Sequence, residues 1–331
     1  MTIALSTKAD PSRIVEIATG YMAAQQLFAA SRSGLFAALA EKPLPTEALA
    51  AATGLSPRMA RILADAMAGL GLLTRSNGAY ALTPAAEAYL TGSKAALDLS
   101  PFLVFLEEIS YPHWLQFPKT VETDRPGDLQ MTEARWKTFL DGVMTYNRLH
   151  AAEFLKAIDV SKSTRLLDLG GLAPYFAIGA MEANPALKTT FAYAVDFIES
   201  LGAELDRAGL SSRSEIVPAA TPSAEVPGPF DLVFLNHVVH RFNATENRAI
   251  IRHARNAAGK GARLALLDFF LDDAPQQRAI DALHAGEYLV IDGTVVYPES
   301  EVRAWLEEAG WRPLEMVNLP GSPRVLLAEA V

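Results

Sequence analysis

Hydrophobic residues follow two different patterns along the chain. In the N-terminal part, as from Pro11 to Leu39, they recur every three or four positions, which is typical of amphipathic helices. In the C-terminal part, short apolar runs alternate with helical stretches. The runs that predict strands begin with Arg165–Asp168 and continue with Thr190–Val195, Asp231–Leu235, Arg263–Asp268 and Val325–Ala328. Strands that alternate with helices predict a doubly wound, mostly parallel α/β sheet, here preceded by a mainly α-helical domain.

The N-terminal third has the pattern of a winged helix. Pro45 and Thr46 begin a helix that Gly54 ends, and a second helix runs from Pro57 to Gly69. The Asn77–Gly78 turn that follows predicts a two-stranded wing. The second helix carries two arginines against one aspartate and much apolar surface, which favours dimerisation over DNA binding. Packing within the same chain is the alternative reading of this apolar surface.

The run from Arg165 to Gly179 predicts a buried strand, a turn and the start of a helix. In a doubly wound sheet this is where a ligand binds, because glycines let the backbone approach it and the helix start offers free N–H groups. Asp168 ends the strand and Gly170 and Gly171 form the turn. Leu172 and Pro174 follow, so the turn is bulkier than a full glycine-rich loop.

Composition narrows the class of protein. The 331 residues are 50% hydrophobic and 20% charged, as in globular proteins, and two domains are expected. The net charge of −9 argues against a nucleic-acid partner. The absence of cysteine excludes disulfides and thiolate metal sites, and no signal peptide or run of about 18 apolar residues is found. These features predict a cytoplasmic protein without a membrane or metal partner.

Several short motifs together resemble one family. They are Gly34-Leu35-Phe36, Gly54-Leu55, Leu70-Gly71-Leu72-Leu73 and Tyr80-Ala81-Leu82-Thr83-Pro84. In this order they resemble the dimerisation domain of the S-adenosylmethionine-dependent O-methyltransferases that act on plant phenolics and bacterial polyketides, and the resemblance continues through the C-terminal part. It implies a class I methyltransferase-like fold, a homodimer and a small-molecule substrate. The implied domains are a dimerisation domain (10–98), a helical linker over the site (99–158) and a catalytic domain (159–331).

The resemblance also implies the catalytic residues. His240 matches the histidine of the family's Leu-His-Asp-Trp motif, which acts as general base on the acceptor hydroxyl. Imidazole suits this task because its ordinary pKa of about 6.5 lets it accept a proton near neutral pH. Arg241 and Phe242 stand where the motif has Asp and Trp, so the imidazole lacks one expected partner. His237 and Arg241 are the other candidates for a catalytic role, and a capping or core histidine is the alternative reading of His240.

Further site residues are predicted around this histidine. The residues expected to bind the cofactor S-adenosylmethionine are Asp168, Gly170, Gly171, Tyr175, Tyr193, Asp196, Asn236 and Met144. The residues expected to bind substrate are His113, Trp114, Phe139, Tyr146, Asn147, Tyr288 and Asp292. Asp268 ends a strand where the family has Glu, with a mainly structural role or a link to the pocket.

The cofactor motifs depart from the family pattern, which leaves the reaction open. Tyr193 falls on the acid that normally binds the ribose, and the adenine position at Ala219–Thr221 contains no acid. One hypothesis is methyl transfer with a shifted cofactor, held by Asp196, Tyr193 or Tyr175. The second is a non-methylating step such as cyclisation, elimination, decarboxylation or a pericyclic reaction, with the cofactor unbound, bound differently or itself consumed. The third is a non-catalytic dimeric binding protein.

Overall fold

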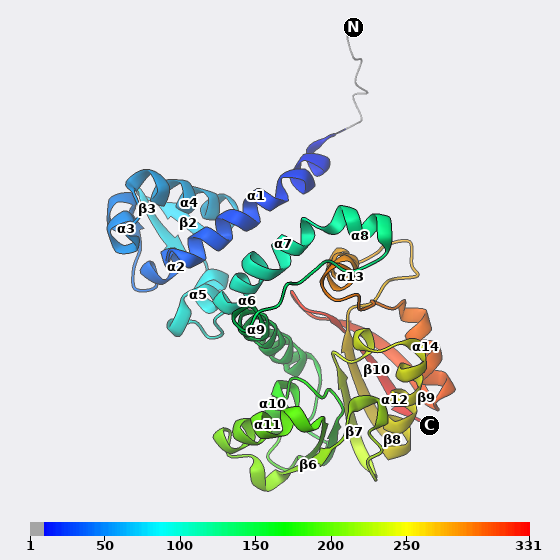
Figure 1. The fold of residues 1–331 in the computed structure, drawn as a ribbon. Coiled ribbons are helices and arrows are strands. Elements are labelled where there is room, and N and C mark those ends of the chain that lie inside the picture. Colours follow the sequence, from blue (N-terminus) through cyan, green and yellow to red (C-terminus); the bar gives the residue numbers. More distant parts are fainter. Residues whose placement is uncertain (1–9) are drawn as a thin grey trace. The chain divides into compact units, whose positions relative to one another are not determined.

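The computed structural model describes residues 10–331 and divides them into two units. The first contains the residues up to Tyr111 together with Thr132–Thr145. The second contains Pro112–Met131 and Tyr146–Val331. The long helix α9 (Glu133–Ala157) contributes its first part to the first unit and its second part to the second. Figure 1 shows the elements of both units in chain order.

The first unit contains the predicted winged helix. Gly54 ends one helix in the left-handed conformation, and the Ser56 hydroxyl caps the next by accepting a bond from the Met59 N–H at 3.2 Å. The elements are α1 (Ser12–Arg32), α2 (Leu35–Ala38), β1 (Leu44–Pro45), α3 (Thr46–Thr53), α4 (Pro57–Gly69), β2 (Leu73–Ser76), β3 (Ala79–Leu82) and α5 (Pro84–Leu90). The strands form a small sheet in the order β1-β3-β2, which confirms the predicted wing.

Helices continue the chain beyond the wing. They are α6 (Ser100–Phe105), the π-helical turn Leu106–Ser110, α7 (Tyr111–Trp114), α8 (Phe117–Thr123) and α9. Gly142 lets α9 pack closely on α6, because a Cβ at this position would come within 2.2 Å of the Phe105 Cβ. Of the helices within residues 10–331, none is both long and apolar enough to span a membrane.

A seven-stranded sheet forms the centre of the second unit. Its order is β6-β5-β4-β7-β8-β10-β9, parallel except that β10 runs antiparallel to both of its neighbours. The strands are β4 (Arg165–Asp168), β5 (Lys188–Tyr193), β6 (Ser214–Pro218), β7 (Phe230–Asn236), β8 (Ala258–Asp268), β9 (Trp311–Asn318) and β10 (Arg324–Ala330). The predicted strands are therefore confirmed, with ends shifted by a few residues.

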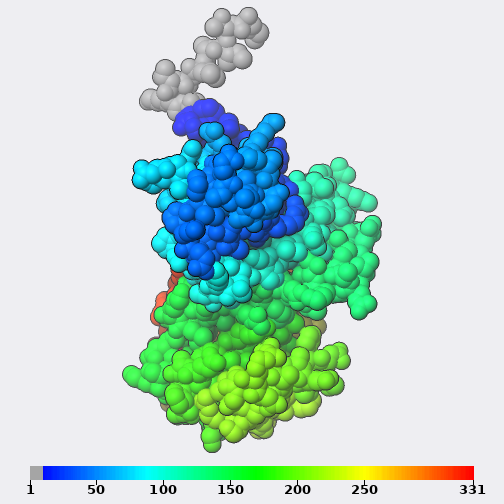
Figure 2. Space-filling view, turned by 90° about the vertical axis from the view of Figure 1, so that its left-hand side faces the viewer, coloured from blue at the N-terminus to red at the C-terminus, as the bar shows by residue number. Residues whose placement is uncertain are grey.

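Alternating side chains place helices on both faces of this sheet. On β4, Leu166 packs in the core under α9, α10 (Tyr175–Ala183) and α11 (Val195–Arg207), whereas Leu167 packs toward the opposite face. That face is covered by α12 (Ala244–Ala257) and α14 (Glu299–Glu308), and α13 (Ala279–Ile291) lies near the end of β8 (Figure 1). Figure 2 shows the α10–α11 side of this unit, where the green to yellow-green part of the chain forms the surface. The carboxyl ends of β4, β7 and β8 lie side by side and carry the candidate site.

Candidate active site

Asp168 and the two glycines after it form a tight turn at the end of β4. The Asp168 carboxylate is buried and accepts a hydrogen bond from the Gly170 N–H at 2.8 Å. Gly171 has a φ of +70°, and a Cβ there would come within 2.5 Å of the Thr221 hydroxyl. Burial raises the pKa of Asp168 to about 7, against the lowering effects of Gly170, Tyr193 and Arg241. The turn therefore holds a carboxyl group that titrates near neutral pH.

Tyr193 occupies the end of β5, beside this turn. Its ring is buried, and its hydroxyl donates to the other Asp168 oxygen at 3.2 Å. Burial and the neighbouring Asp168 raise the pKa of Tyr193, so the phenol stays protonated and remains a donor. Asp196 lies in the first turn of α11 and is exposed, and Tyr175 is half-buried, with the Arg148 guanidinium 4.6 Å from its ring centre. The hydroxyl of Tyr193 is thus bonded inside the protein.

The segment after β7 turns sharply at its first residue. Asn236 is the last residue of the strand, and His237 adopts a φ of +56°, which is uncommon for a residue with a side chain. The 3₁₀ turn Val239–Arg241 follows and carries His240. Asn243 then caps α12 with a capping box that includes Glu246. The strand end, turn and cap together fix the direction of the His240 and Arg241 side chains.

His240 is held by the carboxylate of Asp268 at the end of β8. The imidazole Nδ1 lies 2.9 Å from one carboxylate oxygen and 3.0 Å from the other, and the His240 backbone N–H donates to the same carboxylate at 3.2 Å. Burial acts to raise the pKa of Asp268, but the charge and hydrogen bond of His240 outweigh this and hold it below its usual value. An ionised carboxylate on Nδ1 assigns the proton to Nδ1 and leaves Nε2 as an acceptor. This arrangement can remove a proton from a bound molecule.

Two further imidazoles form a buried pair behind this residue. The Nδ1 of His150, on α9, lies 2.9 Å from the Nε2 of His237. Burial lowers the pKa of His237 to about 3 and that of His150 well below 6.5, with neighbouring histidines adding to the shift of His150. Both rings are therefore neutral at physiological pH, and one donates to the other.

Aromatic rings surround His240 on the α13 side. The Tyr288 ring centre lies 4.5 Å from that of His240, and His284 stacks on Phe269 at 3.7 Å. Tyr146 packs on His150 with 3.9 Å between ring centres and donates its hydroxyl to the Gly321 carbonyl at 3.3 Å. Asn147 is buried one residue later on α9. Aromatic side chains next to a proton acceptor suit a planar ligand, which can pack against their rings.

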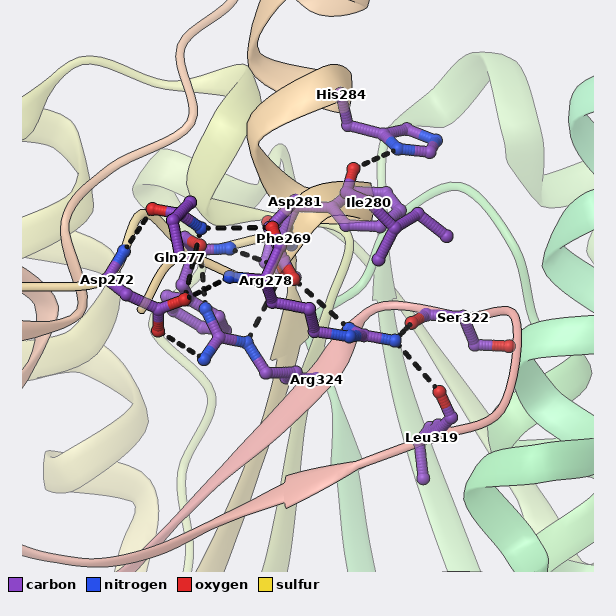
Figure 3. Close-up of polar contacts among 12 residues, drawn as sticks. Phe269, Asp272, Gln277, Arg278, Ile280, Asp281, His284, Leu319, Ser322 and Arg324 are labelled. Carbon is purple, nitrogen blue, oxygen red and sulfur yellow. Dashed lines mark hydrogen bonds and ion pairs between the residues drawn. The ribbon is translucent and has the colours of Figure 1, made fainter. Parts of the chain in front are cut away.

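A buried network of ion pairs fixes the start of α13, as Figure 3 shows. The Asp281 carboxylate, fully buried, accepts bonds from the Phe270 N–H at 3.0 Å and the Arg278 guanidinium at 3.2 Å. Arg324 on β10 pairs with Asp272 at 2.5 Å and approaches Asp281 at 3.5 Å. Arg278 also donates to the carbonyls of the β9–β10 connection (Figure 3). These bonds set the position of the helix that presents His284 and Tyr288.

The remaining predicted residues are divided between the two units. Met144 and Phe139 belong to the first unit, and Phe139 packs edge-on against Phe105 there. In the second unit His113 is buried, and the Trp114 indole donates to Glu287 of α13. Asp292 is exposed and accepts two bonds from Thr294, in its own loop. The roles predicted for these residues stay predictions.

Arg241 contacts the β4 turn. Burial lowers the pKa of Arg241, and the Asp268 carboxylate that holds His240 is close enough to act against this and raise it. Its guanidinium donates to the Gly170 carbonyl at 2.5 Å. Within residues 10–331, the group of side chains that comes nearest to a metal-ligand set is His237, His240 and Asp268, with ligand atoms within 4.8 Å of one another. The Asp268 carboxylate is already bonded to Nδ1 of His240, and the absence of a metal stays a prediction.

Sequence reasoning missed His150 and His284 and gave Asp268 only a structural role or a link to the pocket. Asp268 could have been found, because parallel pairing of β7 with β8 brings its strand end next to the segment that carries His240. His150 and His284 come from helices whose facing positions depend on tertiary packing. Their residue type, suited to proton transfer, was the available signal.

Comparison with known proteins gives a consistent result. A model described as the O-methyltransferase dimerisation domain matches residues 15–92, and one described as the O-methyltransferase domain matches residues 121–312. The chain is 27% identical to a 3-hydroxy-5-methyl-1-naphthoate 3-O-methyltransferase of Streptomyces sahachiroi, covering 96% of this chain and 94% of that protein. It is 26% identical to an L-tyrosine C(3)-methyltransferase of Streptomyces lavendulae, covering 94% of this chain and 90% of that protein.

A solved structure supports the fold. The apo form of the S-adenosylmethionine-dependent methyltransferase SibL superposes with a TM-score of 0.84 at 24% identity, covering 97% of this chain and 99% of that chain. At this identity the likeness concerns the fold, with its N-terminal helical domain and its seven-stranded sheet.

Proposed function

Because the chain belongs to the S-adenosylmethionine-dependent O-methyltransferase family, we propose that it methylates a heteroatom of a small natural product, with His240 as the general base. The observation that carries this proposal is the pairing of His240 Nδ1 with the buried Asp268 carboxylate. The pairing leaves Nε2 to take the proton of the acceptor hydroxyl, and the carboxylate stabilises the imidazolium that forms. The side chain of His240 is 13% exposed, so the base works largely out of water.

The β4 turn fits the cofactor that this family uses. Gly171 keeps the turn tight, because a Cβ at this position would lie 2.5 Å from the Thr221 hydroxyl oxygen. Asn236, at the neighbouring strand end, has both amide atoms buried and without a hydrogen-bond partner, as expected where a ligand completes the network. Gly170, Gly171, Asn236 and Asp168 would hold the cofactor, which supplies an electrophilic methyl group when bound. The chain's own part is to orient the acceptor and remove its proton.

The acceptor proposed is a planar aromatic molecule. The rings of Tyr146, Tyr288 and Phe269 support this class, together with the buried imidazoles. One relative is named for a hydroxynaphthoate and another for tyrosine, both aromatic. The second of these names a carbon as the methylated atom, so a phenol's ring carbon is an outcome that product analysis must distinguish from its oxygen.

We also propose that the protein works as a homodimer through its first unit. A dimerisation-domain model matches residues 15–92. Helix α1 exposes a row of large apolar side chains, namely Ile14, Val15, Ile17, Tyr21 and Met22. Apolar surface of this kind is typical of subunit interfaces.

A non-methylating reaction on the same fold is the second candidate. The observation that favours it is Tyr193, which stands where the ribose-binding acid is expected and directs its hydroxyl to Asp168. A ribose then loses a charge-assisted contact of about 1.5–3 kcal/mol. Proton removal by His240 could start a cyclisation or an elimination without any cofactor.

Calorimetry separates the two candidates. S-adenosylmethionine and S-adenosylhomocysteine are titrated into the purified protein, and methyl transfer to 3-hydroxy-5-methyl-1-naphthoate and related phenols is followed by mass spectrometry. The proposal expects binding of both nucleosides and a product heavier by one methylene. Absence of binding at millimolar ligand would contradict methyl transfer and leave the second candidate.

A further inference from the structure

Gly170 is flanked by two residues that have unpartnered polar atoms. Both amide atoms of Asn236 and the Nε of Arg241 are buried without a hydrogen-bond partner. Asn236 is 4% exposed. A Cβ on Gly170 would lie 3.3 Å from the main-chain carbonyl oxygen of Asn236, and the Gly170 carbonyl accepts from the Arg241 Nη2. Asn236 and Arg241 therefore both lie against the same glycine of the β4 turn.

We propose that Asn236 and Arg241 form a specificity site for the α-amino-acid end of the cofactor, in which the Arg241 guanidinium binds the carboxylate. This inference rests on the proposed function. An α-amino acid carries hydrogen-bond donors on its ammonium group and acceptors on its carboxylate. The unpartnered donors are the Arg241 Nε and the Asn236 Nδ2, and the unpartnered acceptor is the Asn236 Oδ1. The Gly170 carbonyl already accepts from the Arg241 Nη2 and has a second lone pair to offer. The two sets are complementary.

The guanidinium is suited to this task in shape and charge. Its planar fork matches the two oxygens of a carboxylate, and a carboxylate contact is stronger when the donor is charged. The acid that the family motif has at this position would instead repel a carboxylate. Arg241 thus changes which end of a ligand this turn favours.

Burial lowers the pKa of Arg241, and the nearby carboxyl groups of Asp268 and Asp168 act against this and offset its positive charge. Asp168 accepts the Gly170 N–H at 2.8 Å, while Arg241 donates to the carbonyl of that same glycine. The pKa of Asp168 is raised by burial to about 7, and an approaching cation favours its ionised form. A zwitterionic ligand with an added sulfonium charge can therefore be accommodated, with the carboxylate on Arg241 and the positive groups toward Asp168.

The first test changes the ligand and leaves the protein intact. Calorimetry on the full-length wild-type protein compares S-adenosylmethionine with decarboxylated S-adenosylmethionine, which lacks only the carboxylate. We expect decarboxylation to weaken binding about 10- to 100-fold. Equal affinity for the two ligands would overturn the inference. Failure of both to bind would overturn the proposed function as well, so the two failures are distinguishable.

The second test changes the protein. Arg241→Gln should weaken S-adenosylhomocysteine about 10- to 100-fold, while 5′-methylthioadenosine, which lacks the amino-acid end, should change less than about 2-fold. Arg241→Lys keeps the positive charge but lacks the paired N–H donors of the guanidinium, so its affinity for S-adenosylhomocysteine should lie between those of wild type and Arg241→Gln. Circular dichroism checks that each variant is folded.

Two outcomes of this second test would count against the assignment. Equal weakening of both nucleosides would mean general damage to the turn and contradict a specific role for Arg241. Tighter binding of S-adenosylmethionine to Arg241→Gln would show that the guanidinium repels the sulfonium, and this too would overturn the inference.

Discussion

Two polar clusters flank the end of β7, and they differ in how fully the protein satisfies them. The base cluster is His240, Asp268 and Tyr288, and Asp268 accepts bonds from the His240 backbone, its imidazole and the Phe269 N–H. The turn cluster is Asp168, Gly170, Tyr193, Asn236 and Arg241, in which two side chains keep buried atoms without partners. Unpaired buried polar atoms are costly in a folded protein.

The two clusters are therefore prepared for function in different ways. The base cluster is assembled by the protein alone, so His240 is oriented before any ligand binds. The turn cluster lacks partners that a ligand with donors and acceptors could supply. The comparison therefore predicts that damage to the base cluster affects catalysis, and that damage to the turn cluster affects binding.

The largest effect is expected from His240→Ala. Loss of a general base should lower kcat for an aromatic hydroxyl acceptor about 10²- to 10⁴-fold, with the proposed dimer intact. His253→Ala is the matched control, since this histidine lies on α12 with Glu225 3.6 Å away, and it should change kcat less than about 2-fold. Steady-state kinetics and gel filtration are the measurements. Undiminished turnover by His240→Ala would remove this residue from the mechanism.

Asp281→Ala should give the next largest effect, on stability. The change leaves Arg278 and the buried Arg324 without the carboxylate that they share. Removal of one partner from a buried ion pair costs about 3–5 kcal/mol. Urea unfolding gives the free energy of unfolding, and we expect it to fall by about this amount.

Asp273→Ala is the matched control for this stability measurement. Asp273 is an exposed acid in the segment between β8 and α13, and its carboxylate accepts a bond from the Ser300 N–H at 3.1 Å. Its replacement should therefore cost less than about 1 kcal/mol. Equal destabilisation by Asp281→Ala and Asp273→Ala would contradict the anchoring role of the buried ion pairs.

Asp168→Asn tests the turn cluster through pH. The native pKa of about 7 lies above the ordinary 3.8, so the folded protein binds the proton more tightly than the unfolded chain. The contribution of Asp168 to stability is therefore lost as pH rises from about 4 to 7, by up to about 4 kcal/mol. Across this pH window, the free energy of unfolding should change less with pH for Asp168→Asn than for wild type. The same slope in both proteins would show that Asp168 is not the titrating group.

Asn243→Ala should have the smallest effect and should act on both clusters alike. The Asn243 side chain caps α12 by accepting from the N–H groups of Thr245 and Glu246 at 3.0 and 3.1 Å. Its loss should cost about 1 kcal/mol, seen as a lower Tm. Ligand affinity and kcat should stay within about 2-fold of wild type at a temperature where the variant is folded. Loss of ligand affinity alone, or of kcat alone, would show that the cap supports one cluster only.

The fold could be predicted well from the sequence because its signals are local. The apolar runs at β4, β7 and β8 and the Asn77–Gly78 turn specify their elements through neighbouring residues. Asp268 and His150 were harder, because their roles depend on which strand ends and helix faces meet in three dimensions. The direction of the Arg241 side chain, toward Gly170, likewise depends on the turn geometry after β7.

The most direct test of the difference between the two clusters is calorimetric titration of S-adenosylhomocysteine into two variants in parallel. Asn236→Ala should weaken binding about 10-fold or more, because a buried amide that pairs with the ligand is removed, whereas the affinity of His240→Ala should stay within about 2-fold of wild type. The reverse result, with binding lost in His240→Ala and kept in Asn236→Ala, would contradict this difference between the clusters.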